Sequence, residues 1–226
     1  RTTLNGMSFP LATVALTHVV HGRHAYKGLA LLAATAMMLR LELVCLAVPA
    51  YLWTWWHHQR RFVYVFMTGA VTCAGSIALS VLVDSYFWRK RFLWPEGHAV
   101  IFNVIEGRSA EWGVSPPWTY VVRDLPRILF AAFPLALLGC TRRSSFRSPL
   151  VLLICTHVGL MSFLAHKEWR FLVYIVPLCN MLAAQGASML IRTYLGRWLM
   201  LGLVGTSAAL WILGTHVSIY NYPGGE

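Results

Sequence analysis

Four ionisable residues stand within five positions between two long apolar runs: His166, Lys167, Glu168 and Arg170. Burying a charge in hydrocarbon is costly, so such residues lie in the protein interior, at a polar edge or in a water-filled cavity. Lysine binds phosphate as a point charge and arginine binds it as a fork, while glutamate can orient a cation. The block therefore predicts a site for an anionic or polar ligand. The alternative is a charged helix end whose side chains extend to the interface.

A second charged pair, Arg40 and Glu42, interrupts an apolar run that is otherwise free of charge from Gly28 to Trp56. Residues two positions apart do not share one face of a helix. Each side chain therefore needs a different partner, or the helix is irregular at this point. We interpret the pair as the wall of a polar cavity; a structural ion pair between helices is the alternative.

The stretch 84–124 is a further candidate region because it contains four tryptophans and three prolines. Loops longer than about 15 residues are usually functional or disordered, and so many aromatic residues argue against disorder. We expect short interfacial helices and turns. Glu96 is a candidate sugar contact or base, and Asp84 is a weaker candidate base or a helix cap. An aromatic belt at the membrane interface is the alternative for the tryptophans.

The composition indicates an all-α polytopic membrane protein. The chain has 226 residues, of which 58% are hydrophobic and 12% charged, too apolar for an ordinary soluble domain. We expect one transmembrane domain over 1–226 with about seven spans. They lie near 5–20, 28–52, 62–83, 125–140, 149–165, 171–190 and 198–217.

Basic residues set the predicted orientation. The net charge of +11 would suggest nucleic acid for a soluble protein, but these residues fall mostly in short connections, so we expect no nucleic-acid binding. Loops 57–61, 142–147 and 192–197 carry them and alternate along the chain, which predicts a shared cytosolic side. The turn 21–27, the loop 84–124, the block 166–170 and the C-terminal tail are then predicted on the opposite side.

The remaining polar residues predict no metal, cofactor or disulfide. None of the five cysteines has CxxC spacing, and they fall in or beside apolar segments, so we interpret them as buried apolar side chains. The histidines outside the block form no ligand set with a carboxylate. Asn5 and Gln185, near or inside spans, are interpreted as partners in hydrogen bonds between helices.

The block His166-Lys167-Glu168-Trp169-Arg170-Phe171, followed by Tyr174 and Pro177, resembles the signature of the dolichyl-phosphate-mannose-dependent mannosyltransferases, glycosyltransferase family 22. The loop is most similar to the α-1,6 branch of that family. The matching elements are Val83–Arg89, Leu93–Gly97, Phe102-Asn103 and Ser109–Pro116, with Asn5, Arg40 and Glu42 also at family positions.

This resemblance implies a C-type glycosyltransferase bundle in the endoplasmic reticulum membrane, with a luminal active site. The implied donor is dolichyl-phosphate-mannose and the implied acceptor a lipid-linked oligosaccharide, which receives its eighth mannose with inversion. The implied donor-site residues are His166, Lys167, Glu168 and Arg170, beside the cavity residues Arg40 and Glu42. The implied acceptor-site residues are Trp94, Glu111, Trp112 and Tyr120.

The family's acidic catalytic residue lies in a loop that would precede residue 1, since the chain begins at Arg1 and enters an apolar run almost at once. We therefore expect a fragment that is inactive alone. Three alternatives stay open. The first is a transporter or flippase of a lipid-linked or polar solute, and the second is an α-1,2 or GPI-anchor mannosyltransferase of the same family. The third is a noncatalytic subunit of a glycosylation complex.

Overall fold

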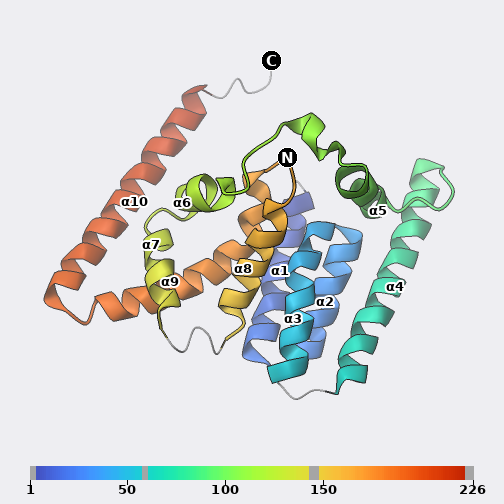
Figure 1. Cartoon of the computed structure of the whole chain (residues 1–226), viewed down its shortest axis with the longest axis horizontal. Coiled ribbons are helices and arrows are strands. Elements are labelled where there is room, and N and C mark those ends of the chain that lie inside the picture. Colours follow the sequence, from blue (N-terminus) through green and yellow to red (C-terminus); the bar gives the residue numbers. More distant parts are fainter. Residues whose placement is uncertain (1–3, 58–60, 143–147, 222–226) are drawn as a thin grey trace.

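The computed structural model describes residues 4–57, 61–142 and 148–221, and within these ranges the chain forms helices and no strand (Figure 1). The all-α prediction is confirmed. The α-helices are α1 (Leu4–His21), α2 (Ala25–Met38), α3 (Val44–His57), α4 (Phe62–Trp88), α5 (Pro95–Val100), α6 (Leu125–Leu129), α7 (Ala132–Cys140), α8 (Leu150–Ser162), α9 (Val176–Leu190) and α10 (Tyr194–Asn221). Shorter turns of 3₁₀- or π-helix are η1 (Leu41–Leu43), η2 (Ile101–Ile105), η3 (Arg108–Trp112), η4 (Tyr120–Asp124) and η6 (Trp169–Ile175).

Three helical stretches among the described residues are long and apolar enough to cross a membrane: Phe62–Trp88, Trp169–Leu190 and Tyr194–Val217. They correspond to the predicted spans 62–83, 171–190 and 198–217. Two further apolar helices, α2 and α8, are shorter. The set of seven continuous spans is therefore not confirmed, because two of the predicted segments are broken.

The predicted span 28–52 is two helices joined by a turn at 39–43. Arg40 is extended (φ −153°, ψ 100°), and η1 follows it before α3 begins. The start of α2 packs on the end of α1, where an added Cβ at Gly28 would lie 2.8 Å from the Cβ of His18. The end of α2 meets the start of α1, because Arg40 and Leu4 line one pocket. The two helices are therefore antiparallel (Figure 1).

This break corrects the predicted sidedness of the 21–27 turn. The 21–27 turn lies at the same end of the bundle as the α3–α4 connection, and the Arg40–Glu42 pair lies at the other end (Figure 1). A turn at this point carries both charged residues out of the apolar middle, where an unpaired charge costs several kcal/mol or more. Residues 58–60 and 143–147, part of the predicted basic loops, and the tail 222–226 lie outside the described residues.

The predicted span 125–140 is also broken. Phe130 has φ 47° and ψ −122° between α6 and α7. Pro134 has no N–H to donate to the carbonyl four residues back, which weakens the helix at Phe130. The side chain of Ser207 on α10 accepts the free N–H of Ala131 at 3.0 Å. A hydroxyl from the last helix thus satisfies a backbone group that the break exposes.

The core lies among α1, α2, α3, α7, α8 and α9, while α4 and α10 stand at the two edges (Figure 1). None of the apolar window of α10 is buried within the protein, so this helix presents its apolar side chains to lipid. Small residues allow the closest helix contact. A Cβ added at Gly139 of α7 would lie 2.0 Å from the carbonyl oxygen of Leu182, and one at Gly186 of α9 would lie 2.0 Å from that of Leu135.

We predict that Gly186→Ala separates α7 from α9 and lowers stability, because a methyl group cannot fit at 2.0 Å from a backbone oxygen. Overpacking of this kind costs about 1–3 kcal/mol. Thermal unfolding in detergent would measure the loss. The control is Gly159→Ala in α8, where no atom lies within 4 Å of the added Cβ, and where alanine should be neutral or stabilising. Equal melting temperatures for the two variants would contradict this packing.

Candidate functional site

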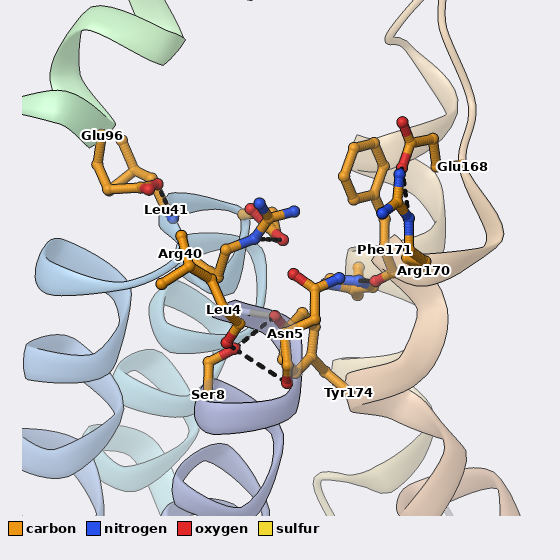
Figure 2. Close-up of polar contacts among 12 residues, drawn as sticks. Leu4, Asn5, Ser8, Arg40, Leu41, Glu96, Glu168, Arg170, Phe171 and Tyr174 are labelled. Atoms are coloured by element: carbon orange, nitrogen blue, oxygen red, sulfur yellow. Dashed lines mark hydrogen bonds and ion pairs between the residues drawn. The ribbon is translucent and has the colours of Figure 1, made fainter. Parts of the chain in front are cut away.

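A pocket of about 270 Å³ lies at the end of the bundle that carries Arg40 and the charged block. Three distant segments meet there: the start of α1, the α2–η1 turn and the start of η6 (Figure 2). The lining residues are Leu4, Asn5, Arg40, Glu168, Arg170 and Phe171. Two guanidinium groups thus approach the same space from opposite walls, with the Asn5 amide below them (Figure 2).

On one wall, the Nε of Arg40 donates to Glu42 Oε1 at 2.7 Å. The extended backbone at Arg40 allows this pairing, which a continuous helix would have prevented; the irregular-helix alternative is the one that the structure has. The guanidinium carbon also lies 5.9 Å from the centre of the Phe171 ring, within range of a cation–π contact. Partial burial acts to lower the pKa of Arg40, but Glu42 outweighs it and the net shift is upward.

On the opposite wall, Glu168 joins the side chains of Arg170 and His166. Its Oε2 accepts from the Nε of Arg170 at 2.8 Å, and its Oε1 lies 3.3 Å from the Nε2 of His166. The carboxylate therefore holds Arg170 facing Arg40 (Figure 2). Each arginine carries its own carboxylate partner, so the two like charges are partly neutralised before any ligand arrives.

Helices below the pocket fix the chain around Phe171. The Nε2 of His157, on α8 and fully buried, donates to the carbonyl of Phe171 at 2.7 Å. The hydroxyls of Ser8 on α1 and Tyr174 on η6 lie 2.8 Å apart and are buried. These bonds attach the pocket-forming turn to two helices. The sequence analysis assigned no role to His157, and only the family match pointed to Tyr174.

Lys167 differs from Glu168 and Arg170 because it does not line the pocket. It is 6% exposed, and its ammonium donates to the carbonyls of Leu164 at 2.6 Å and Ser115 at 3.1 Å. The backbone N–H of Ser115 in turn donates to Ala165 at 3.0 Å. Burial lowers the pKa of Lys167. This geometry gives no support to the predicted contact between Lys167 and a ligand phosphate; Lys167 instead fastens the long loop to the block.

The long loop is fastened at a second point by Trp94 and Glu96. The indole Nε1 of Trp94 donates to the carbonyl of Met37 at 2.9 Å, and Glu96 Oε2 accepts the N–H of Leu41 at 2.7 Å. The Met37 carbonyl and the Leu41 N–H belong to the end of α2 and the turn after it. The loop therefore caps the turn that holds Arg40. Burial raises the pKa of Glu96, although the Leu41 N–H opposes the shift. Neither Trp94 nor Glu96 lines the pocket.

The other predicted residues of the loop are divided between surface and interior. Asp84 accepts from the Ser80 hydroxyl at 2.7 Å and is not brought to the pocket. Tyr120 is fully buried, so it is not available to an acceptor. Glu111 is exposed and pairs with Arg108 at 2.7 Å, and Trp112 is 67% exposed. Among the predicted acceptor residues, Glu111 and Trp112 are therefore accessible.

Asn5 lines the pocket, although its residue type alone suggested a hydrogen bond between helices. Its place in the family pattern was the better signal. Leu4 and Phe171 also line the pocket. Leu4 was not identified, because an apolar residue in an apolar chain gives no signal, and Phe171 was named only as part of the family signature. A second cavity, of about 310 Å³, lies at the far end of α3; among the described residues, aromatic and aliphatic side chains and His57 line it.

We predict that Lys167→Met loosens the contact between the loop and the block. Methionine keeps the length of the side chain but donates no hydrogen bond, and an unsatisfied buried polar group costs about 1–3 kcal/mol. Hydrogen exchange at the Ser115 amide should accelerate at least tenfold. The control is Lys27→Met, at an exposed lysine. Unchanged exchange at Ser115 would show that Lys167 does not hold the loop.

We predict opposite effects for two substitutions at Glu96. Glu96→Ala removes the acceptor for the Leu41 N–H and should cost about 1 kcal/mol of stability, whereas Glu96→Gln keeps an acceptor and removes the buried charge. A carboxyl whose pKa is raised on folding loses stability as pH rises above its ordinary value, 4.5 here. The stability of Glu96→Gln relative to the unchanged protein should therefore increase from pH 4 to pH 7 in thermal unfolding. A decrease would contradict the buried position of the carboxylate.

Comparison with known proteins shows the family of this chain. Residues 1–222 match the model of the Alg9-like mannosyltransferase family. A probable Dol-P-Man:Man(7)GlcNAc(2)-PP-Dol alpha-1,6-mannosyltransferase of Schizosaccharomyces pombe is 33% identical over 88% of this chain and 38% of its own length. A Saccharomyces cerevisiae protein with the same activity in its name is 32% identical over 97% of this chain and 41% of its own length. A Drosophila melanogaster protein of that name is 38% identical over 66% of this chain and 23% of its own length.

The chain thus spans less than half the length of these relatives. No solved structure matches it. The family model nevertheless covers nearly every residue, including all the segments that meet at the pocket. The chain belongs to the Alg9-like mannosyltransferase family.

Proposed function

We propose that this chain forms part of an enzyme that transfers mannose from dolichyl-phosphate-mannose to a lipid-linked oligosaccharide, adding the eighth mannose in an α-1,6 linkage. The observation that carries the proposal is the pocket that unites Asn5, Arg40, Glu168 and Arg170 at one end of the bundle. The named activity of relatives that match most of the chain supports the choice of substrates.

The donor already carries a good leaving group, a phosphate, so the reaction needs stabilisation of departing negative charge more than a strong acid. Arg40 and Arg170 supply it from opposite walls, and Glu42 and Glu168 hold them in place. A volume of about 270 Å³ is just below the usual range for ligand pockets, about 300–1,000 Å³. It suits one sugar phosphate and excludes a whole oligosaccharide.

The acceptor hydroxyl forms the new bond at the mannose anomeric carbon as the bond from that carbon to the phosphate oxygen breaks, with inversion. The hydroxyl proton passes to a carboxylate. Glu168 is unsuited to that role because His166 and Arg170 both occupy it, and the resemblance assigns the base to a loop before residue 1. Glu111 and Trp112, both exposed on the long loop, are the proposed acceptor contacts.

The proposed location is the endoplasmic reticulum membrane, with the pocket toward the lumen. The turn that carries Arg23 and Lys27 lies at the opposite end of the bundle (Figure 1). The start of α4, which Arg61 directly precedes, lies at that same end. Positive residues favour the cytosolic side, which supports this orientation. The structure thus adds the 21–27 turn to the basic side.

A transporter or flippase would need charged groups along a path through the spans. Here the charged groups that line a cavity lie at one end, which favours a surface reaction over passage. An α-1,2 or GPI-anchor activity within the same family would use the same pocket with a different acceptor. Assay of the full-length protein with labelled dolichyl-phosphate-mannose and a panel of lipid-linked acceptors separates these functions.

We predict that Arg40→Gln or Arg170→Gln lowers mannose transfer by at least about 100-fold, because each removes a charge-assisted contact to the departing phosphate. Steady-state kinetics of the full-length protein would measure the loss, with thermal unfolding to confirm folding. The control is Arg142→Gln, an exposed arginine at the other end of the bundle, which should transfer normally. Normal transfer by both pocket variants would remove the pocket from the reaction.

A further inference from the structure

The turn 89–92, which follows α4, presents three adjacent cations on the same side of the protein as the pocket. Arg89, Lys90 and Arg91 are all exposed, and the turn stands at the outer edge of the bundle, away from the core (Figure 1). Positively charged residues beside a span are expected on the cytosolic side. Because Arg89, Lys90 and Arg91 lie at the opposite end, the orientation of the protein does not explain them, and an anionic ligand would.

The backbone of this turn is specifically shaped. Arg89 and Phe92 have φ values of 53° and 55°, in the left-handed region that residues other than glycine rarely adopt. Ser85 holds the turn at both sides: its carbonyl accepts the N–H of Lys90 at 3.2 Å, and its hydroxyl accepts the N–H of Leu93 at 2.9 Å. Two strained residues within four positions indicate a conformation maintained by its surroundings.

The charges on the turn are also available. Among the ion pairs of the described residues, none includes Arg89, Lys90 or Arg91. The other cations of the long loop differ, since Arg108 pairs with Glu111 and Arg123 with Asp124. The turn therefore leaves three cations without an internal carboxylate.

The neighbouring aromatic residues place the turn at the membrane surface. Tyr86, Phe87, Trp88 and Phe92 are 67–85% exposed at the end of α4, an apolar helix long enough to span the bilayer. Exposed aromatic rings at the end of a span mark the level of the lipid headgroups. Phosphate groups carried on membrane lipids lie at this level, within reach of Arg89, Lys90 and Arg91.

The pocket is too small for the whole acceptor, so the reacting mannose and the diphosphate of the acceptor must bind at different places. The pocket holds one sugar phosphate, whereas the relatives' acceptor, Man(7)GlcNAc(2)-PP-Dol, has nine sugars beyond its diphosphate. The reacting mannose must reach the pocket while the diphosphate stays at the bilayer surface. We infer that the turn 89–92 is the binding site for the diphosphate of the lipid-linked acceptor. This inference rests on the proposed function.

The test replaces Arg89, Lys90 and Arg91 together by glutamine in the full-length protein, which removes three charges and keeps the length of the turn. Two acceptors are compared: the lipid-linked glycan and the same glycan released without its diphosphate. Each cation near a membrane surface contributes about fivefold to binding, so KM for the lipid-linked acceptor should rise about 100-fold. KM for the released glycan and for the donor should not change.

The matched control is Arg123→Gln, an exposed arginine of the same loop whose charge is already paired with Asp124; it should leave both KM values unchanged. An unchanged KM for the lipid-linked acceptor in the triple variant would overturn the inference. An equal rise for both acceptors would also overturn it, because it would report a misfolded loop.

Direct binding separates this inference from the proposed function. In nanodiscs that contain the protein, a polyprenyl diphosphate should bind the unchanged protein about 100-fold more tightly than the triple variant, whether or not mannose is transferred. Failure of transfer with retained binding would overturn the proposed function alone. Equal competition by phosphatidylserine would identify a phospholipid headgroup as the ligand and overturn the assignment to the acceptor.

Discussion

The cost of placing a charge in hydrocarbon governs this structure. Arg40 and Glu42 occur in the middle of an apolar run, where a continuous helix would leave them in the bilayer on different faces. The chain leaves the helix at Leu39 instead, and both residues reach the polar end of the bundle, 2.7 Å apart. That single turn brings Arg40 opposite Arg170 and gives Glu96 a backbone N–H to accept. The pocket therefore depends on how the chain avoids burying two charges.

The long loop is part of the bundle because three side chains bind backbone groups across it. Lys167 fastens it beside the block, and Trp94 and Glu96 fasten it at the α2–η1 turn. Each bond joins segments more than fifty residues apart in the sequence. The loop thus links the two walls that carry the arginines, which explains how short irregular helices can be well ordered above a membrane bundle.

Residue type and spacing predicted the helical class and an ordered loop, and they singled out the charged block and Arg40 with Glu42 as candidates. They did not predict which charged side chains face the pocket. Lys167 and Arg170 are both cations of one block, but one is buried against carbonyls and the other lines the cavity. The difference depends on the backbone at 163–168, which is not helical and therefore has no periodicity to read. The break at Phe130 was missed for a related reason, since hydropathy alone does not mark where an apolar run is interrupted. At Arg40 an irregular helix was one of the open alternatives.

The paired state of the pocket arginines bears on how a product would leave. Two guanidinium groups without carboxylate partners would bind the lipid phosphate that the proposed reaction releases so tightly that its dissociation would limit turnover. Glu42 and Glu168 already accept hydrogen bonds from these groups, so each guanidinium would bind the phosphate with part of its charge already balanced. The affinity of the pocket for the lipid phosphate is lower as a result, and the product dissociates faster.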